Sequence, residues 1–301
     1  MLGKGAIRLL LIIILLTIAF SYYMCNYNGQ ARMESSLQTE PGKASSSAGL
    51  QIVEKWLMPA ELAEISANVL VDNDRMACIE DNDGIIYIYN LKAKQVERKI
   101  VFAENGDFEG LALVGKTFFV LRSDGFLYEV TPGTNEKPVV RTYDLPFTRK
   151  NDTEPLAYDK ANDRLLIGVK EQDLGGGRGK GVYSFDLKTK QLSTTAVFYI
   201  SGGADKETVD RKGKKKSKKS KNEIKPSEIA IHPQTGEFYI LNGPASELLI
   251  ATRAGEIKST IALDKSIFPQ PEGLSFSENG DLYISSEGVK GGQGVIARVK
   301  L

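Results

Sequence analysis

The sequence has almost none of the residues on which disulfide frameworks and histidine-based catalytic sites depend. Its 301 residues include two cysteines and one histidine. Cys25 directly follows an apolar segment and Cys78 lies in a predicted strand, so we expect no intramolecular disulfide and interpret Cys78 as a buried apolar side chain. His232, in the turn sequence IHPQTGE, is predicted to be a turn residue, which disfavours histidine-dependent nucleophilic catalysis.

The chain also lacks a net charge that would suggest a partner. It carries 39 basic and 38 acidic residues, for a formal charge of +1. The charges are unevenly distributed, because eight of the eleven residues from Arg211 to Lys221 are basic. We interpret the surrounding segment, residues 201–226, as a solvated loop inserted in the fold. Alternatively, the loop binds anionic lipid or cell-surface polysaccharide. Binding to nucleic acid is disfavoured because the N-terminal segment described below is typical of an exported protein.

Long hydrophobic runs are absent except near the N-terminus, where no charged residue occurs from Leu9 to Met24. Lys4 and Arg8 precede this run, a pattern typical of an exported chain with its N-terminus in the cytoplasm. Residues 1–25 are therefore predicted to form an apolar helix that acts as an uncleaved signal anchor. A cleaved signal peptide and a lipidated Cys25 are the alternatives. Polar residues 26–49 are predicted to be a flexible stalk. We expect a membrane-anchored protein of the bacterial cell envelope, with its domain facing the periplasm or the exterior.

A glutamate that precedes an apolar strand recurs along the remaining chain. It occurs in AEISANV, FEGLALV, TEPLAYD, SEIAIHP and PEGLSFS, at Glu64, Glu109, Glu154, Glu228 and Glu272. The intervals are 45, 45, 74 and 44 residues, and the long one contains the basic insertion. A repeat of about 40 to 50 residues is the signature of propeller blades, each of which is a four-stranded sheet.

The strands in each repeat predict an all-β protein, a β-propeller formed by residues 50–301. Five repeats predict five four-stranded blades, and six blades are the alternative, with the additional one drawn from residues 185–226. The last repeat ends at GVIARVKL, its third strand. We therefore expect residues 50–59 to supply the missing outer strand, which would close the ring and remove two exposed sheet edges.

The motifs EGLAL, EPLAYD, SEIAIHPQTGEFYIL and QPEGLSFSENGDLYISSEG, with FFVLRSDGFLYEV, resemble the SdiA-regulated family of exported bacterial propeller proteins over roughly residues 51–301. More distantly, the sequence is similar to calcium-dependent propellers that include gluconolactonase-like hydrolases and phytase-like phosphatases. The resemblance implies the fold and a metal ion, and it implies no settled reaction.

If each glutamate begins the innermost strand of its blade, the five glutamates surround one mouth of the central channel. The second strand of each blade returns to that mouth, with its end at Glu80 and Asp81, Arg122 to Asp124, Lys170 and Glu171, Asn242, or Ser286 and Glu287. Clustered carboxylates repel one another unless protons, basic side chains or a cation relieve the repulsion. Oxygen ligands favour calcium, so we predict a calcium site drawn from the five glutamates. The alternative is structural, with the carboxylates accepting backbone N–H groups of neighbouring blades.

Two functions are compatible with this sequence. The first is a membrane-tethered, extracytoplasmic propeller that binds a ligand or an envelope protein at its channel mouth, with calcium as cofactor. The second is a calcium-dependent hydrolase of phosphate esters or lactones, which would use a carboxylate base and basic substrate-binding residues at the same mouth. No sequence motif identifies catalytic residues or decides whether the protein is an enzyme.

Overall fold

The protein is built from β-strands and short turns of 3-10 helix. This computed structural model describes residues 50–133, 137–176, 179–200, 208–209, 215–216 and 223–301. The predictions for residues 1–49, including the apolar helix, and for most of the basic loop lie outside the described residues. The described residues belong to one compact unit. Among them, no helix combines the length and apolar character that crossing a bilayer requires.

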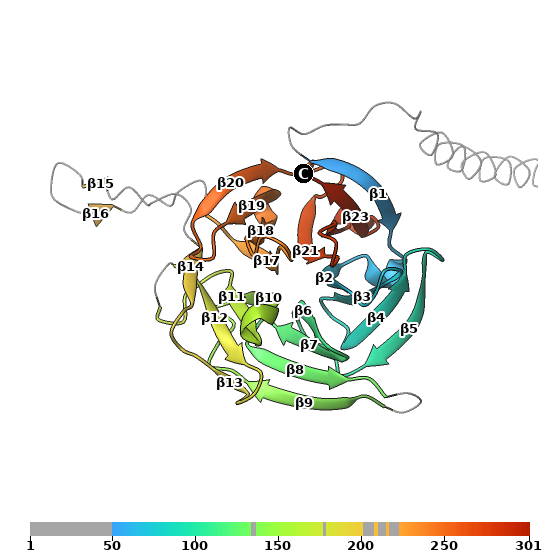
Figure 1. The fold of residues 1–301 in the computed structure, drawn as a ribbon, viewed down its shortest axis with the longest axis horizontal. Coiled ribbons are helices and arrows are strands. Elements are labelled where there is room, and N and C mark those ends of the chain that lie inside the picture. Colours follow the sequence, from blue (N-terminus) through green and yellow to red (C-terminus); the bar gives the residue numbers. More distant parts are fainter. Residues whose placement is uncertain (1–49, 134–136, 177–178, 201–207, 210–214, 217–222) are drawn as a thin grey trace, which may run out of the picture. The chain divides into compact units, whose positions relative to one another are not determined.

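Five antiparallel blades surround a common centre, and all but the third have four strands (Figure 1). From the innermost strand outward, the first blade contains β2 (Ile65–Leu70), β3 (Arg75–Glu80), β4 (Ile85–Asn90) and β5 (Gln95–Val101). The second contains β6 (Phe108–Val114), β7 (Thr117–Arg122), β8 (Phe126–Thr131) and β9 (Val139–Asp144). The fourth contains β17 (Pro226–Ile231), β18 (Phe238–Asn242), β19 (Glu247–Ala251) and β20 (Ile257–Ala262).

The third blade is irregular on its outer side. It consists of β10 (Thr153–Asp159), β11 (Arg164–Val169), β12 (Lys180–Asp186) and two short strands that both pair with β12, β13 (Gln191–Leu192) and β14 (Phe198–Ile200). Residues 185–200 thus complete this blade, and the described residues contain no sixth four-stranded sheet. The five-blade prediction is confirmed. The two-residue strands β15 (Thr208–Val209) and β16 (Lys215–Lys216) pair with each other.

The fifth blade closes the ring by joining the two ends of the domain. Its innermost strands are β21 (Gln270–Phe276) and β22 (Leu282–Glu287), followed by β23 (Val295–Lys300). Its outer strand is β1 (Gln51–Leu57), which pairs antiparallel with β23, as the sequence predicted. The indole Nε1 of the buried Trp56 donates to the backbone oxygen of Leu91 in the first blade at 2.8 Å. This contact attaches the closing strand to the neighbouring blade.

The hydrophobic core is divided among the blade interfaces. The apolar side chains of the described residues form five clusters, and each cluster combines residues of two neighbouring blades. Cys78 is a free, fully buried member of the cluster between the fifth and first blades, which confirms its predicted apolar role. A single blade cannot bury both of its faces, so its stability depends on its neighbours.

The five innermost strands contact one another around the centre, β2 with β6, β6 with β10, β10 with β17, β17 with β21, and β21 with β2. Each has an irregularity of register at its beginning, where one additional residue is inserted relative to the second strand. A β-bulge of this kind bends the strand and redirects a side chain. Short 3-10 turns, η1 (Ala60–Leu62), η2 (Lys160–Asn162), η3 (Gly243–Ala245) and η4 (Val289–Gly291), connect other strands.

Candidate functional site

The bulges show how the five predicted glutamates are related in space. Glu109, Glu154 and Glu272 lie within the bulges of β6, β10 and β21. In the first and fourth blades, the bulged residue is Ser66 or Ser227. The remaining two glutamates are displaced from this position: Glu228 follows the bulge of β17 by one residue, and the exposed Glu64 lies just before β2.

We call the site that contains Glu109, Glu154, Glu272 and Lys170 the mouth. Lys170 directly follows β11, the second strand of the third blade, so the hairpin returns it to the beginning of β10. The charges of Glu154, Glu272 and Glu109 act on Lys170 and raise its pKa even though burial opposes its charge. These side chains therefore form one electrostatic unit drawn from three blades.

Glu154 is the most buried carboxylate of the mouth, with 2% of its surface exposed. Its Oε1 forms an ion pair with the Lys170 ammonium. Its Oε2 is buried and has no hydrogen-bond partner among the residues that the structure describes. Burial, followed by the charge of Glu109, raises the pKa of Glu154 well above its ordinary value, although Lys170 opposes this shift. An unpartnered buried acceptor is costly, and its retention in a core requires an explanation.

Glu109 and Glu272 are partly exposed and give the mouth access to solvent. Burial raises the pKa of Glu109 to about 8, with further contributions from the negative charges of Asp107 and Glu272. Burial also raises the pKa of Glu272, whereas the charge of Lys170 lowers it. A carboxyl group with a pKa near neutrality can both donate and accept a proton at physiological pH.

Asp107 and Asp152 also contribute to this electrostatic environment, and our sequence reasoning missed them. Asp152 has a φ of 52°, a left-handed backbone that aspartate tolerates better than most residues, and its backbone oxygen accepts the N–H of Lys170 at 2.8 Å. The signal was present as a repeated D-x-E pattern, DFE and DTE, at the beginning of β6 and β10. Two acidic residues in the same turn increase the negative potential at the mouth.

Glu228 has a different role from its neighbours. It is 1% exposed, and its Oε1 accepts two backbone N–H groups, those of Leu156 and Ile229, both at 2.8 Å. Leu156 belongs to β10 of the third blade, whereas Ile229 belongs to β17 of the fourth. Burial raises the pKa of Glu228 well above its ordinary value, against the effect of these two hydrogen bonds. Glu228 therefore links two blades by accepting backbone N–H groups, which is the structural role given as the alternative to calcium binding.

Glu64 forms a separate acidic cluster with Glu80 and Asp81, which we call the rim cluster. One carboxylate oxygen from each of the three lies within 4.8 Å of the others, and no other set of three potential ligands in the described residues meets this criterion. Burial raises the pKa of Glu80 to about 7. Burial and then the charge of Glu64 raise the pKa of Asp81. The cluster combines one predicted glutamate with Glu80, the last residue of β3, and Asp81, which follows it.

Most other side chains predicted at the mouth have partners nearby. The Arg122 guanidinium forms two hydrogen bonds with the Asp124 carboxylate, at 2.8 and 3.0 Å. Glu171 forms an ion pair with Lys225. Asn242 donates to Glu247 at 2.9 Å, and the hydroxyl of Ser286 accepts the N–H of Gln270 at 3.0 Å. The Glu287 carboxylate accepts a hydrogen bond from the side chain of Gln270 at 2.7 Å, and burial followed by the charge of Glu272 raises its pKa to about 7.

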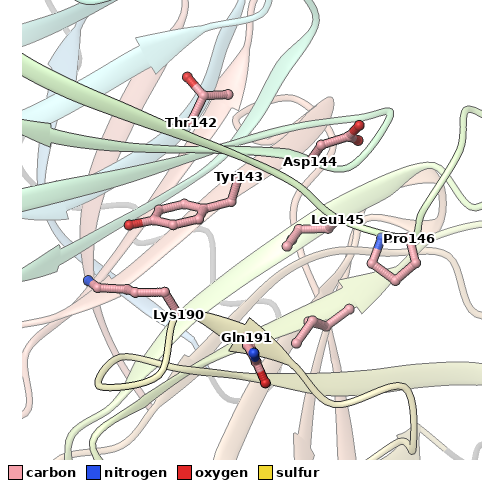
Figure 2. A pocket seen from close by; sticks show the side chains of 8 residues that line it. Thr142, Tyr143, Asp144, Leu145, Pro146, Lys190 and Gln191 are labelled. Carbon is pink, nitrogen blue, oxygen red and sulfur yellow. The ribbon is translucent and has the colours of Figure 1, made fainter.

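A groove of about 470 Å³ lies away from the mouth, at the outer side of the second and third blades (Figure 2). It is lined by Thr142, Tyr143, Asp144, Leu145, Pro146, Lys190, Gln191 and Leu192. Two of its polar side chains are bound within the protein, since both the Tyr143 hydroxyl and the Lys190 ammonium contact the Glu129 carboxylate, at 2.5 and 3.0 Å. The buried acceptor at the mouth, which has no partner among the described residues, makes the mouth the stronger candidate.

His232 is located in the turn after β17, as predicted. Its Nδ1 accepts the backbone N–H groups of Gln234 and Thr235, at 3.3 and 3.2 Å. His232 therefore stabilises the turn. Its neighbour Ile231 pairs with Phe238 at the turn end of the hairpin, whereas Glu228 pairs with Leu241 toward the opposite end.

The comparisons with known proteins agree with the observed architecture. The sequence profile of the family described as SdiA-regulated matches residues 72–289. The glutaminyl cyclase of Myxococcus xanthus has a similar structure, with a TM-score of 0.57 and 15% sequence identity, over 83% of this chain and 95% of the cyclase. A luciferin-regenerating enzyme gives a TM-score of 0.51 and 15% identity, over 84% of this chain and 95% of that enzyme. No curated protein sequence matches the chain. At these identities, the two structures support the fold alone.

Proposed function

The chain belongs to the SdiA-regulated family, and from this membership and the geometry of the mouth we propose that it is an extracytoplasmic binding protein, tethered to the membrane, whose mouth takes a ligand or an envelope partner. The observation that carries the proposal is the group of glutamates with raised pKa values around Lys170. Clustered acids reduce the stability of a fold, and groups that destabilise the fold in this way are commonly found at ligand-binding and catalytic sites. The groove in Figure 2 lacks this feature.

Calcium is the proposed cofactor, and the rim cluster is its best-supported site. Three carboxylates from Glu64, Glu80 and Asp81 supply the hard oxygen ligands that calcium prefers. Glu64 is the only one of the five glutamates in that set. Ligation of calcium by Glu109, Glu154, Glu228 or Glu272 remains a prediction, and Glu228 already accepts two backbone hydrogen bonds.

Calorimetric titration of the purified full-length protein with calcium, after treatment with a chelator, tests this proposal. We expect one saturable binding event and a rise in unfolding free energy of about 2.7 kcal/mol at a hundredfold excess over the dissociation constant. The variant Glu64→Gln should lose both effects, whereas Glu109→Gln should keep them if the rim cluster is the site. Loss only in Glu109→Gln would move the site to the mouth, and absence of calcium heat in the parent would reject the metal.

A calcium-dependent hydrolase is the second candidate, and the pKa of Glu109 favours it. A carboxyl group that titrates near pH 8 can act as general acid or base toward an ester or lactone, and Lys170 provides a positive charge for an anionic oxygen. Assays with p-nitrophenyl phosphate and γ-butyrolactone, with and without calcium, test this function. Turnover that disappears in Glu109→Gln would support hydrolysis, and its absence in the parent would leave the binding function.

The tether depends on the sequence of residues 1–25, with its basic flank and uncharged run. We expect fractionation to recover the full-length chain with membranes, and deletion of residues 1–25 to release a folded, soluble domain. Anionic lipid or polysaccharide remains the proposed partner of the basic loop, since each basic residue near an anionic membrane contributes about 1 kcal/mol. Recovery of the intact chain in the cytosol would contradict the proposed location.

A further inference from the structure

The mouth contains a buried acceptor to which no group among the described residues donates a hydrogen bond. Glu154 Oε2 is buried without a hydrogen-bond partner, while Oε1 of the same carboxylate binds the Lys170 ammonium. The bulge at Glu154 interrupts the ladder between β10 and β11, so the regular pairing of these strands does not supply a donor there. Because a carboxylate can only accept hydrogen bonds when ionised, the missing partner is a donor.

The neighbouring side chains at the mouth do not supply that donor in this arrangement. The Glu228 carboxylate, which also approaches β10, is itself an acceptor of backbone N–H groups. Arg122, a basic residue at the end of β7, is bound to Asp124. At the mouth, three carboxyl groups, those of Glu109, Glu154 and Glu272, face one ammonium, that of Lys170. When these three carboxyl groups are ionised, the mouth has a surplus of negative charge together with a vacant acceptor.

The vacant acceptor and the surplus of carboxylates together favour a ligand that carries both a positive charge and a hydrogen-bond donor. A divalent metal ion at Oε2 would lie beside the Lys170 ammonium, which repels a double charge more strongly than a single one, and the described carboxylates of the mouth form no three-ligand set. A neutral ligand would leave the surplus charge uncompensated. A primary ammonium group supplies both a positive charge and N–H donors, and charge-assisted hydrogen bonds to carboxylates are among the strongest in proteins.

We propose that the mouth is a binding site for the primary ammonium group of a small organic ligand, which donates a hydrogen bond to Glu154 Oε2 and lies near the carboxylates of Glu109 and Glu272. This inference names the ligand class of the proposed binding function and rests on it. The partial exposure of Glu109 and Glu272 provides access from solvent. The raised pKa values of these carboxyl groups support the site, because bound positive charge would relieve their mutual repulsion.

Titration calorimetry of the full-length protein with three probes of similar size tests the proposal. The probes are n-butylammonium, tetramethylammonium and 1-butanol, measured at pH 8 and at constant ionic strength. Tetramethylammonium has the charge without N–H donors, and butanol has a donor without the charge. We expect saturable binding of n-butylammonium alone. Equal binding of the two cations would show charge attraction without a hydrogen-bonding site and would overturn the proposal, as would a lack of saturable binding by n-butylammonium.

Variants locate the site. Glu154→Gln should weaken n-butylammonium binding at least tenfold, because an amide carries no charge and one of its ends is a donor. Glu272→Gln, at a partly exposed position, should weaken binding severalfold and serves if Glu154→Gln does not fold. Glu129→Gln, a partly buried glutamate of β8 outside the mouth, is the matched control and should bind as the parent does. Parental affinity in both mouth variants would place the amine elsewhere.

The calcium titration separates this inference from the function on which it rests. Calcium binding that is lost in Glu64→Gln, together with an absence of n-butylammonium binding, would reject the ammonium site and preserve the calcium site at the rim cluster. Binding of n-butylammonium without calcium heat would reject the cofactor and support the ligand class. If neither probe binds, both the inference and the calcium part of the proposed function are wrong.

Discussion

At the residue scale, carboxylates that look alike in the sequence experience different environments. Glu154 has one oxygen on Lys170 and one without a partner, whereas a single oxygen of Glu228 accepts two backbone N–H groups. Glu109 is partly exposed and has a pKa near 8. These differences arise because each blade presents its carboxylate to a different neighbour, and they lead to two predictions about single residues.

The first prediction concerns pH and Glu109. Its folded-state pKa of about 8 lies above the ordinary value of 4.5, so the folded protein holds this proton more tightly than the unfolded chain. The contribution of Glu109 to stability is therefore complete below about pH 4.5 and is lost as the pH rises toward 8. Glu109→Gln is neutral throughout, and we expect it to melt a few degrees higher than the parent at pH 8.5, with the difference disappearing near pH 4.

Thermal melts from pH 4 to pH 9 check this expectation, with Glu129→Gln as a control of opposite sign. Hydrogen bonds from Tyr143 and Lys190 lower the pKa of Glu129, although its burial acts against them. The ionised Glu129 carboxylate contributes to the unfolding free energy above its ordinary pKa, and this contribution is lost as the pH falls through the lower pKa of the folded state. This variant should be less stable than the parent at pH 7 and approach it in acid. Parallel pH profiles for the parent and Glu109→Gln would contradict the raised pKa.

The second prediction concerns the connection between the third and fourth blades. Glu228→Ala removes the acceptor of the Leu156 and Ile229 N–H groups and leaves both unsatisfied in the core. We expect it to lower the unfolding free energy by about 2 to 4 kcal/mol, since each buried unsatisfied group costs about 1 to 3 kcal/mol. Glu228→Gln keeps an oxygen acceptor and should cost less. Urea unfolding measures both variants, and equal losses would indicate that charge, rather than the accepted hydrogen bonds, is responsible.

At the element scale, the closing strand β1 and the bulges determine how the ring is assembled. β1 pairs with the last strand of the chain, and its Trp56 packs against Tyr283 with ring centroids 6.2 Å apart. Trp56 also belongs to the apolar cluster between the fifth and first blades. Strand pairing and side-chain packing therefore reinforce the same closure. An open ring would expose the edge of β23, which is a template for association with other chains.

The third prediction tests this closure. Trp56→Ala should destabilise the protein by about 3 to 5 kcal/mol, because it removes a buried aromatic side chain and its hydrogen bond to Leu91. Trp56→Phe retains most of the packing and should lose less. Leu57→Ala, at an exposed position of the same strand, is the control and should change stability little. Chemical unfolding and size-exclusion chromatography measure stability and association. Parental stability in Trp56→Ala would show that the closing strand contributes little.

At the scale of the whole molecule, five blades bring residues far apart in the chain to one mouth. Glu109 and Glu272 are separated by more than half of the chain, yet the charge of Glu272 contributes to the raised pKa of Glu109. A site of this kind depends on ring closure, because β21 must contact β2 before the fifth blade can face the others. We therefore expect variants that open the ring, such as Trp56→Ala, to weaken binding at the mouth even though Trp56 lies outside it. Calorimetry at a temperature where the variant remains folded checks this outcome.

The sequence by itself determined the architecture. Strand periodicity, the glutamate repeat and the incomplete last repeat predicted five blades and closure by residues 50–59, because these features depend on local alternation and on spacing along the chain. Among the glutamates that the sequence singled out are Glu109, Glu154 and Glu272, whose charges act together on Lys170. The sequence placed all five glutamates at equivalent positions, however, and the strand registers show that only Glu109, Glu154 and Glu272 lie within the bulges.

Only the tertiary structure decided what each carboxylate does. The bulges shift the register by one residue, and this shift cannot be inferred from a residue pattern that reads EGL, EPL and EIA in similar ways. Whether a carboxylate accepts an N–H of the next blade, an ammonium or nothing depends on groups that are distant in sequence. The physical reason is that charge interactions and hydrogen bonds act over a few ångströms in space, whereas the repeat specifies only where each blade begins.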